Sequence, residues 1–467
     1  MRPTILRLLA GSAAMAGGVL AAPAALAQSC DTAGLDLPDG FCATEFATDA
    51  HQPRHLAVAD NGTVYVNLAS EGDDGGLMAL RDSNDDGKAD ERATFGKGGG
   101  TGLAIHDGWL YAATVTDIYR YRLGDSLTPE GEPEHLVTGM PEQDSHAARG
   151  LAVGDDDMIY VNNGAPSNAC QEEDRSPGSK GQDPCPLLEN HGGIWQFSAT
   201  ETGQEFSPDA RFATGLRNMF ALAFHDRQLY GVQHGRDQLH SNWPDEFTQK
   251  QSAHLPAEEM FAVSEGDDFG WPYCYYDPDQ DKKVLGPEYG GDGEKVGRCD
   301  KFKDPIATFP AHWAPMDIAF YSGDAFPKDY RGGAFIAFHG SWNRAPSPQA
   351  GYRVVYLPFE NGKPADDHRT FAEAKGFTGS DTIRSPGRPG DLRRRRALYQ
   401  RRSGQHDLPC DPRRRLSARP RARMQKAGTC GAGLFSCAIF RTAGEMSDYA
   451  ARAECPRPAE ALRPTSS

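Results

Sequence analysis

Residues 54–68 read RHLAVADNGTVYVNL, and the same pattern recurs four more times along the chain. It consists of an apolar pair around Ala, a turn of Asp, Asn or Gly, and an apolar strand that usually contains Tyr. The other copies read TGLAIHDGWLYAAT (101–114), RGLAVGDDDMIYVNN (149–163), FALAFHDRQLYGV (220–232) and, in a longer form, MDIAFYSGDAFPKDYRGGAFIAF (316–338). Each copy predicts two short strands joined by a hairpin turn. The chain is therefore built from a repeated β unit.

The spacing of these units indicates the architecture. The first three begin at residues 54, 101 and 149, which are 47 and 48 residues apart. This period fits the blade of a β-propeller, a four-stranded sheet repeated around an axis. Five blades can be read, and insertions separate the later ones. We expect an all-β, six-bladed propeller whose last blade is disrupted; a β-sandwich is the alternative, but it would not repeat one unit.

The composition changes after about Pro386, where a third segment, 387–467, follows the propeller domain, 28–386. Fourteen Arg lie between Arg384 and Arg423, and apolar periodicity is lost. One interpretation is a disordered basic tail. The other is a reading-frame error in GC-rich DNA: allowed codons for residues 394–402, read from the second base, spell Asp-Gly-Ala-Leu-Tyr-Ile-Ser-Asp-Asp. This resembles another blade unit, so we favour a frameshift that has replaced a sixth blade.

The N-terminus predicts export. Arg2 and Arg7 precede an apolar run from Leu8 to Leu26, which ends in a small-residue cleavage pattern before Gln28. Residues 1–27 are therefore expected to be a cleaved signal peptide, with a membrane anchor as the alternative. No later stretch approaches the roughly 18 apolar residues of a membrane span. We expect a periplasmic or secreted protein without membrane insertion after cleavage.

Charge and cysteine content fit this location. The net charge of -16 disfavours nucleic acid, which binds basic surfaces. Ten Cys in an exported chain suggest disulfides. Six of them form pairs that are close in sequence, namely Cys30 with Cys42, Cys170 with Cys185 and Cys274 with Cys299. Six Cys allow fifteen connectivities, so this pairing is an expectation from spacing alone.

Several common catalytic motifs are absent from the sequence. No Gly-x-Gly-x-x-Gly opens a helix, and there is no Gly-x-Ser-x-Gly and no His-Glu-x-x-His. What remains is a set of polar residues at strand edges, where propeller loops converge near the axis. These are His146 with Arg149, Arg217 with Asn218, the run His234-Gly235-Arg236-Asp237, His312, and the run from His339 to Arg344.

Four stretches resemble the soluble quinoprotein glucose dehydrogenase and L-sorbosone dehydrogenase family, and more closely its sorbosone branch. They are HAARGLAVGDDDMIYVNNGAPSNAC (146–170), GLRNMFALAF (215–224), DDFGWPYC (267–274) and GGAFIAFHGSWNR (332–344). The resemblance runs from about His51 to Gly376. It implies a six-bladed propeller that binds pyrroloquinoline quinone (PQQ) and Ca²⁺ at the mouth of its channel.

The resemblance also implies roles for six residues. His146 matches the catalytic base, which takes a proton from the substrate hydroxyl as hydride leaves for the quinone. Arg217 matches the arginine that stabilises charge on the quinone oxygen, and Asn218 matches a cofactor contact. Gly235 and Arg236 match the pair whose carbonyls hold the Ca²⁺. Arg344 lies near the position of a basic residue that meets a cofactor carboxylate.

One local departure concerns the group that orients His146. The family places an Asp after the strand that follows the catalytic His, but this sequence reads Asn162-Asn163-Gly164 there. We therefore expect Asn163 or a nearby acid such as Glu172 to orient the imidazole.

A separate motif suggests a structural calcium site. Asp82, Asn84 and Asp86, followed by Gly87, have the spacing of a calcium loop. The Glu that should close the loop is replaced by Ala93. A structural Ca²⁺ site and a plain acidic turn are both open interpretations.

These observations predict a periplasmic quinoprotein dehydrogenase that oxidises an aldose or a sorbosone-like sugar aldehyde with PQQ and Ca²⁺. Its electrons would pass to an acceptor such as a cytochrome c. Two alternatives remain open, a Ca²⁺-dependent propeller lactonase and a non-catalytic binding propeller.

Overall fold

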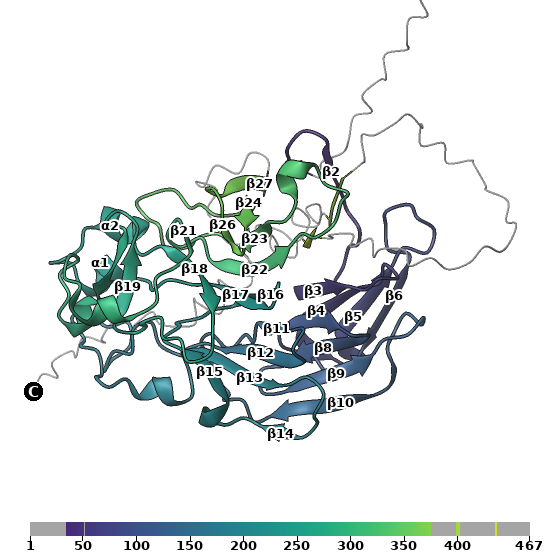
Figure 1. The fold of residues 1–467 in the computed structure, drawn as a ribbon, viewed down its shortest axis with the longest axis horizontal. Coiled ribbons are helices and arrows are strands. Elements are labelled where there is room, and N and C mark those ends of the chain that lie inside the picture. The colour runs from purple at the N-terminus through teal and green to yellow at the C-terminus, as the bar shows by residue number, and fades with distance from the viewer. Residues whose placement is uncertain (1–33, 51, 375–397, 402–434, 437–467) are drawn as a thin grey trace, which may run out of the picture. The chain divides into compact units, whose positions relative to one another are not determined.

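The computed structural model describes residues 34–50 and 52–374, together with the backbone of two short strands at 398–401 and 435–436. The described part is an all-β propeller with five four-stranded blades and little helix (Figure 1). This confirms the propeller and excludes the sandwich. Each repeated sequence unit supplies the first two strands of one blade.

The strands of each blade pair antiparallel with their sequence neighbours. Blade one contains β3 (Pro53–Val58), β4 (Val64–Gly72), β5 (Gly75–Arg81) and β6 (Glu91–Phe95). Blade two contains β7 (Leu103–His106), β8 (Trp109–Ala113), β9 (Ile118–Arg122) and β10 (Glu130–Thr138). Blade three contains β11 (Leu151–Val153), β12 (Met158–Asn163), β13 (Gly193–Ser198) and β15 (Arg211–Thr214). Blade four contains β16 (Ala221–His225), β17 (Gln228–Gln233), β18 (Glu258–Val263) and β21 (Ala307–Phe309). Blade five contains β22 (Pro315–Phe320), β23 (Ala334–Phe338), β24 (Arg353–Leu357) and β27 (Arg369–Ala374).

The hairpin turns follow the local sequence. In blade two, His106 pairs with Trp109 across the two-residue turn Asp107-Gly108. Both turn residues have positive φ, 44° and 73°, as a type I′ turn requires. Glycine reaches this conformation without a steric penalty from Cβ, and Asp tolerates it better than most residues. The turn therefore fixes the register of the strands that flank it.

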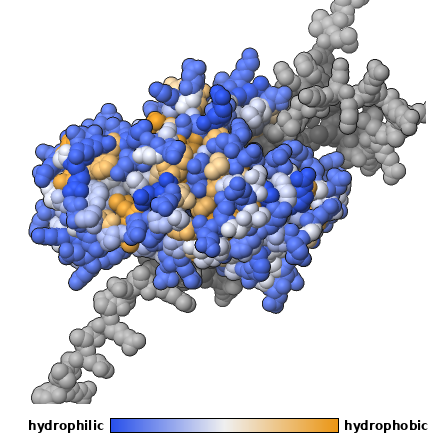
Figure 2. Space-filling view, turned by 60° about the horizontal axis from the view of Figure 1, so that its bottom comes forward, coloured by the Kyte–Doolittle hydropathy of each residue, from blue (hydrophilic) through white to orange (hydrophobic). Residues whose placement is uncertain are grey.

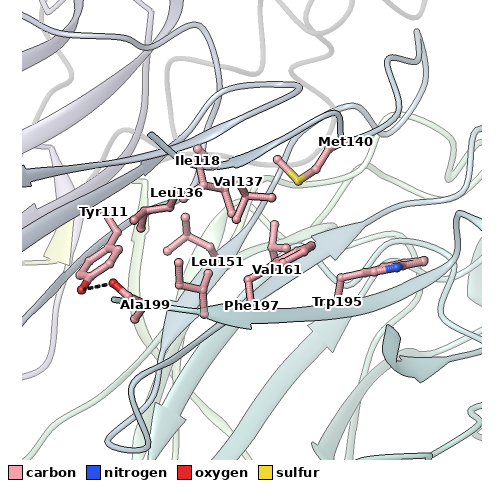
Figure 3. Close-up of a cluster of buried hydrophobic side chains, with 12 residues drawn as sticks. Tyr111, Ile118, Leu136, Val137, Met140, Leu151, Val161, Trp195, Phe197 and Ala199 are labelled. Atoms are coloured by element: carbon pink, nitrogen blue, oxygen red, sulfur yellow. Dashed lines mark hydrogen bonds between the residues drawn. The ribbon is translucent and has the colours of Figure 1, made fainter. Parts of the chain in front are cut away.

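Hydrophobic layers between neighbouring blades hold the propeller together. Figure 3 shows the layer between blades two and three, where Ile118, Leu136 and Trp195 have no exposed surface. The Tyr111 hydroxyl donates to the Ala199 carbonyl at 3.2 Å, which satisfies the one polar atom that this ring brings into the layer. Burying each large apolar side chain stabilises the fold by about 1.5–3 kcal/mol.

The innermost strands of successive blades, β3, β7, β11, β16 and β22, lie against one another in that order. The first and last of them are also linked, because His55 Nε2 donates to the Met316 carbonyl at 2.8 Å. The His55 ring contacts Phe220 of blade four, with centroids 4.9 Å apart. Groups from three blades therefore meet at His55: its own side chain, the Phe220 ring of blade four and the Met316 carbonyl of blade five.

The remaining elements decorate the blades or lie outside them. The strands are β1 (Leu35–Asp36), β2 (Phe41–Thr44), β14 (Gln204–Glu205), β19 (Cys274–Asp277), β20 (Lys282–Leu285), β25 (Phe359–Glu360), β26 (Lys363–Pro364), β28 (Leu398–Arg401) and β29 (Phe435–Ser436). The short helices are α1 (Leu239–Asn242) and α2 (Gln249–His254). The 3-10 turns are Pro186–Glu189, Pro208–Ala210, Pro287–Tyr289, Gly297–Lys301 and Lys328–Tyr330.

Two insertions carry disulfides. Cys170–Cys185 lies between the second and third strands of blade three, and Cys274–Cys299 lies between the third and fourth strands of blade four. Both pairs were predicted from spacing and are confirmed. The third predicted pair involves Cys30, which lies outside the described residues.

The strands before the first blade and after the fifth blade pair in two places. β1 adds to blade five by pairing with β27, whereas β2 pairs with β28 in a separate three-stranded sheet with β29. The six-blade count is therefore not confirmed, because the described residues form five blades. The predicted signal peptide and most of the Arg-rich segment lie outside the described residues. No helix in the described part of the chain is long and apolar enough to cross a membrane.

Candidate functional site

Loops at the strand ends of blades three, four and five bring together most of the polar residues selected from the sequence. His146 precedes β11, Arg217 and Asn218 precede β16, and the run His234–Asp237 follows β17. His312 precedes β22, and Asn343 follows β23. Hydrogen bonds and an ion pair connect Arg217 with Gly235, Asp237, His312 and Asn343. His146 and Asn218 lie beside this group, because Asn218 follows Arg217 in the chain and a Cβ added at Gly164 would lie 2.8 Å from both of them. We call the whole set the channel cluster: His146, Arg217, Asn218, Gly235, Asp237, His312 and Asn343.

His146 is held in one orientation by the loop after β12. Its Nδ1 lies 2.5 Å from the Ala165 carbonyl oxygen, which can only accept a hydrogen bond, so Nδ1 carries the proton. Its backbone has a positive φ of 54°, and the Gln143 side-chain amide donates to the carbonyls of both His146 and Gly164. A side chain at Gly164 would lie 2.8 Å from His146 Cβ, so only glycine fits there.

The electrostatic setting keeps His146 neutral. Burial, followed by the nearby positive charge of Arg217, holds the pKa of His146 well below its ordinary value. A neutral imidazole protonated at Nδ1 has its free lone pair at Nε2. The arrangement can therefore accept a proton at Nε2.

The predicted orienting group is wrong. Asn163 is fully buried and accepts a hydrogen bond from Arg149 Nη1 at 2.5 Å, while its amide donates to the Asn190 carbonyl. Glu172 is exposed. Neither side chain forms a hydrogen bond with His146, and the main-chain carbonyl of Ala165 orients the imidazole instead. A carbonyl has no sequence signature, which is why residue types could not reveal it.

Arg217 forms the centre of the cluster. Its guanidinium donates to the Gly235 carbonyl at 2.8 Å and to Asp237 Oδ2 at 2.9 Å, and only 3% of the residue is exposed. Its Nε is buried and has no hydrogen-bond partner among the described residues. One donor of a buried cation is thus available to an acceptor that enters the site.

Asp237 ties the loops of three blades together. Besides Arg217, its carboxylate contacts Arg175 at 3.3 Å, the Asn343 amide at 2.6 Å and His312 Nδ1 at 3.6 Å. Burial alone raises the pKa of Asp237, but Arg217, His312 and Arg175 together outweigh it and hold the pKa well below the ordinary value. Asp237 is therefore ionised and keeps Arg217 in place.

The predicted calcium ligands lie beside Arg217. The Gly235 carbonyl accepts from Arg217, and the Gly235 amide donates to Glu258 Oε2 at 2.7 Å. The Arg236 guanidinium is turned the other way and forms a two-point ion pair with Glu288, which is buried. The structure thus assigns the Arg236 side chain a structural partner.

Glu258 was missed by the sequence analysis. Both of its oxygens accept main-chain hydrogen bonds, from Gly235 at 2.7 Å and from Ala314 at 3.0 Å. Burial raises the pKa of Glu258 to about 7. The available signal was a pair of acids, Glu258-Glu259, directly ahead of the apolar strand residues Met260 and Phe261, because charged residues seldom begin a buried strand without a partner.

Two of the remaining predicted residues differ in their placement. Asn218 belongs to the cluster, where its Oδ1 accepts from Asn162 at 2.9 Å and a side chain at Gly164 would lie 2.8 Å from that same oxygen. Arg344 does not, because its guanidinium donates to the main-chain carbonyls of Ala311, at 2.9 Å, and Pro348, at 3.2 Å. Arg344 fastens its own loop instead of facing Arg217.

The acidic loop of blade one behaves as a turn. Asp82 accepts from the amides of Asn84, Asp86 and Gly87, so its carboxylate caps the loop backbone. Asp90 accepts from Ser83 and Asn84. Within the described ranges, no group of three or more His, Cys, Asp or Glu side chains is placed to hold a metal ion. The geometry gives no support to the structural calcium site predicted at Asp82, Asn84 and Asp86.

Comparison with known proteins gives a matching family model and several relatives. A family model described as TrAA12-like matches residues 35–388. An uncharacterized protein of Borreliella burgdorferi is 33% identical over 184 residues, which are 38% of this chain and 42% of that protein. A protein of Hypocrea jecorina named pyrroloquinoline quinone-dependent sugar dehydrogenase is 23% identical over 348 residues, 68% of this chain and 77% of that protein. The chain therefore spans less than half of the first relative and about three quarters of the second.

Solved structures share the fold. The calcium structure of a Trichoderma reesei protein of Carbohydrate-Active Enzymes Family AA12 has a TM-score of 0.61 at 20% identity, covering 80% of this chain and 96% of that one. The holo form of the pyranose dehydrogenase PQQ domain from Coprinopsis cinerea has a TM-score of 0.58 at 16% identity, covering 73% and 86%. The comparisons therefore confirm the predicted similarity to PQQ-dependent sugar dehydrogenases. They do not confirm the glucose and sorbosone dehydrogenase family itself.

Proposed function

This chain belongs to the TrAA12-like family, and from that premise we propose that it is a PQQ-dependent dehydrogenase of an aldose or a sorbosone-like sugar aldehyde. The observation that carries the proposal is the pairing of a neutral, oriented imidazole at His146 with the buried cation of Arg217. The names of the Hypocrea and Coprinopsis relatives support the same reaction class.

His146 would act as the base. Its Nε2 accepts the proton of the hydroxyl on the carbon that is oxidised, which in an aldose is the anomeric hydroxyl and in an aldehyde is a hydroxyl of its hydrate. Nδ1 stays bonded to Ala165 and prevents the ring from turning. PQQ, when bound, supplies the two-electron acceptor for the hydrogen that leaves the substrate carbon. Proton and hydride then leave the substrate for different partners, which oxidises it.

Arg217 and Asn218 would hold the cofactor. PQQ carries three carboxylates and two quinone oxygens, all hydrogen-bond acceptors, and the unpartnered Nε of Arg217 is a buried donor that requires one. Asp237 keeps this cation fixed by accepting a hydrogen bond from Arg217 Nη2 at 2.9 Å. The donor set therefore fits an anionic, oxygen-rich cofactor. Arg344 would meet a cofactor carboxylate only if its bonds to Ala311 and Pro348 were exchanged.

The fit for Ca²⁺ rests on main-chain oxygens of Gly235 and Arg236. A carbonyl oxygen has two lone pairs, so the Gly235 carbonyl can accept from Arg217 and still offer a ligand to a hard cation. Asp237, which is ionised and bonds Arg217, places negative charge close to that loop. We keep Ca²⁺ at the cofactor as part of the proposal. The structural Ca²⁺ site at Asp82, Asn84 and Asp86 rests on the sequence spacing alone.

The missing sixth blade belongs to the same proposal. β2 pairs with β28 in a sheet outside the five blades, and Phe41 of β2 packs on Phe326 and Phe371 at 5.0 and 4.9 Å. β2 therefore packs against blade five and pairs with β28, which comes from the C-terminal part of the chain. We propose that residues 387–467 replace the native end of a sixth blade through a frameshift. Sequencing the DNA of codons 384–430 tests this; an unbroken read confirming the present frame would overturn it.

We further propose that the mature chain, from residue 28, is periplasmic or secreted and passes electrons to a cytochrome c or a similar carrier. The signal-peptide pattern of residues 1–27 and the disulfides Cys170–Cys185 and Cys274–Cys299 support export. A cytochrome c that is reduced only when sugar and enzyme are both present would support the acceptor.

The deciding experiment is dye reduction by full-length protein, in the present frame and with the restored blade, after loading with PQQ and Ca²⁺. Sugar-dependent reduction that is lost in His146→Ala supports the proposal. His106→Ala is the matched control, because His106 is a partly exposed residue of blade two whose ring contacts Asp157. Lactone opening without dye reduction would favour the lactonase, and a folded protein with neither activity would favour a binding propeller.

A further inference from the structure

Trp342 differs from every other large apolar side chain in the described ranges. It is 59% exposed and is the one exposed large hydrophobic residue among them. The face in Figure 2 is mostly hydrophilic. The sequence contains six Trp, all within the described residues, and the other five are buried or half-buried. An exposed indole offers a ligand a large, rigid apolar face together with one N–H donor.

The position of Trp342 ties it to the channel cluster. The next residue, Asn343, donates to Asp237 Oδ1 at 2.6 Å, and the other oxygen of Asp237 accepts from Arg217 at 2.9 Å. The loop between β23 and β24 therefore reaches the cluster at Asn343. Trp342 lies one residue from that contact, at the rim of the site.

The backbone at Trp342 is fastened although its side chain is free of the core. The Trp342 carbonyl accepts from Gln349 Nε2 at 3.2 Å. On the other side, Ser341 is buried, its hydroxyl donates to Gln349 Oε1 at 2.7 Å, and its carbonyl accepts from the Tyr352 hydroxyl at 2.6 Å. The indole is thus presented on a fixed support, and little ordering is needed on binding.

We propose that Trp342 is a carbohydrate-binding platform at the rim of the site. Its indole face stacks on the apolar C–H face of a pyranose ring while the reacting end of the sugar lies toward His146. This inference rests on the proposed function for its substrate class. A rigid aromatic ring suits this ligand because a sugar offers a flat apolar face and hydroxyls at its edge.

The first test reads binding without turnover. In protein without quinone, acrylamide quenches the fluorescence of the exposed Trp342 more than that of the five buried or half-buried Trp. We expect D-glucose or cellobiose to protect this accessible fraction, and Trp342→Phe to remove both the fraction and its protection. Trp109→Phe, in blade two, is the control and should keep the protection.

The second test measures steady-state kinetics of the loaded full-length enzyme. Loss of one aromatic stacking partner in Trp342→Ala should raise the KM for sugar about tenfold and leave kcat within about twofold. Trp342→Tyr, which keeps a ring, should recover most of the loss. The KM for the electron acceptor should not change.

The outcomes separate this inference from the proposed function. An enzyme that oxidises sugars with an unchanged KM in Trp342→Ala overturns the platform and leaves the function standing. A raised KM for the acceptor alone also overturns it and makes Trp342 a docking residue for the electron carrier. Sugar protection of Trp342 in a protein that oxidises no sugar supports the platform and overturns the dehydrogenase.

Discussion

Nδ1 of His146 lies 2.5 Å from the main-chain carbonyl oxygen of Ala165, and this contact determines which ring nitrogen is free to react. A carbonyl accepts but never donates, so the proton is on Nδ1 and the lone pair is on Nε2. In many enzymes a carboxylate performs this task. A neutral acceptor brings no negative charge to offset burial and the positive charge of Arg217, which hold the pKa of His146 well below its ordinary value.

The first prediction concerns His146 itself. His146→Ala should lower kcat about 10²- to 10⁴-fold, because a positioned base contributes a factor of that size. Binding of PQQ, followed by its absorbance, should change little since Arg217 and Asn218 remain. A variant that keeps more than a tenth of the wild-type kcat would remove His146 from the mechanism.

The second prediction is the pH dependence of the reaction. Because the pKa of His146 is well below 6.5, the imidazole stays unprotonated as the pH falls through 6.5. The acidic limb of kcat/KM for the free enzyme should therefore lie well below pH 6.5. A limb centred at or above pH 6.5 would show that the base has an ordinary or raised pKa, and would contradict the lowered pKa of His146.

The third prediction tests Asp237 as the anchor of Arg217. Asp237→Asn removes the negative charge that faces a buried cation, and breaking such a pair costs about 3–5 kcal/mol. We expect a lower urea midpoint and weaker PQQ binding. Arg217→Met combined with Asp237→Asn should cost much less than the sum of the single changes. Additive costs in this double-mutant cycle would mean that the two residues are not coupled.

The fourth prediction concerns the disulfide Cys170–Cys185. Its sulfurs pack with Ala165 and Trp271, so the bond stiffens the loop whose carbonyl orients His146. Replacing both Cys by Ser should destabilise the fold by about 3 kcal/mol for a loop of 15 residues. It should also lower kcat more than the same replacement of Cys274 and Cys299, which lie in blade four. Equal effects of the two replacements would separate the disulfide from the site.

The sequence predicted the parts of this molecule that repeat. The turn Asp107-Gly108 and the alternating strands beside it have local signatures, so five blades could be read without a structure. The positions of His146, Arg217 and Asp237 followed because blade ends converge. The residues that failed, Asn163 and Arg344, were assigned from type and position, but their hydrogen bonds go to Arg149 and to main-chain carbonyls. Such partners depend on loop paths, which no spacing rule fixes.

Glu258 provides the last prediction, because its pKa of about 7 in the fold exceeds its ordinary value of 4.5. Between these values the folded protein binds more protons at this carboxyl than the unfolded chain does. The contribution of Glu258 to stability is therefore fully present below pH 4.5 and is lost as the pH rises to about 7.

Glu258→Gln cannot ionise, so the difference in unfolding free energy between variant and wild type should move in favour of the variant as the pH rises from 4.5 to 7. The total change should be about 2 kcal/mol, measured by urea unfolding at several pH values. Comparing the two proteins at each pH cancels the contributions of His146 and His234, whose lowered pKa values act in the opposite direction. Glu259→Gln is the matched control for loss of a neighbouring buried carboxylate, which in the wild type is ion-paired with Lys283. A difference that is constant with pH would mean that Glu258 is already ionised at pH 4.5 to 7, and the carboxylate would then stand ready as negative charge behind the Gly235 loop.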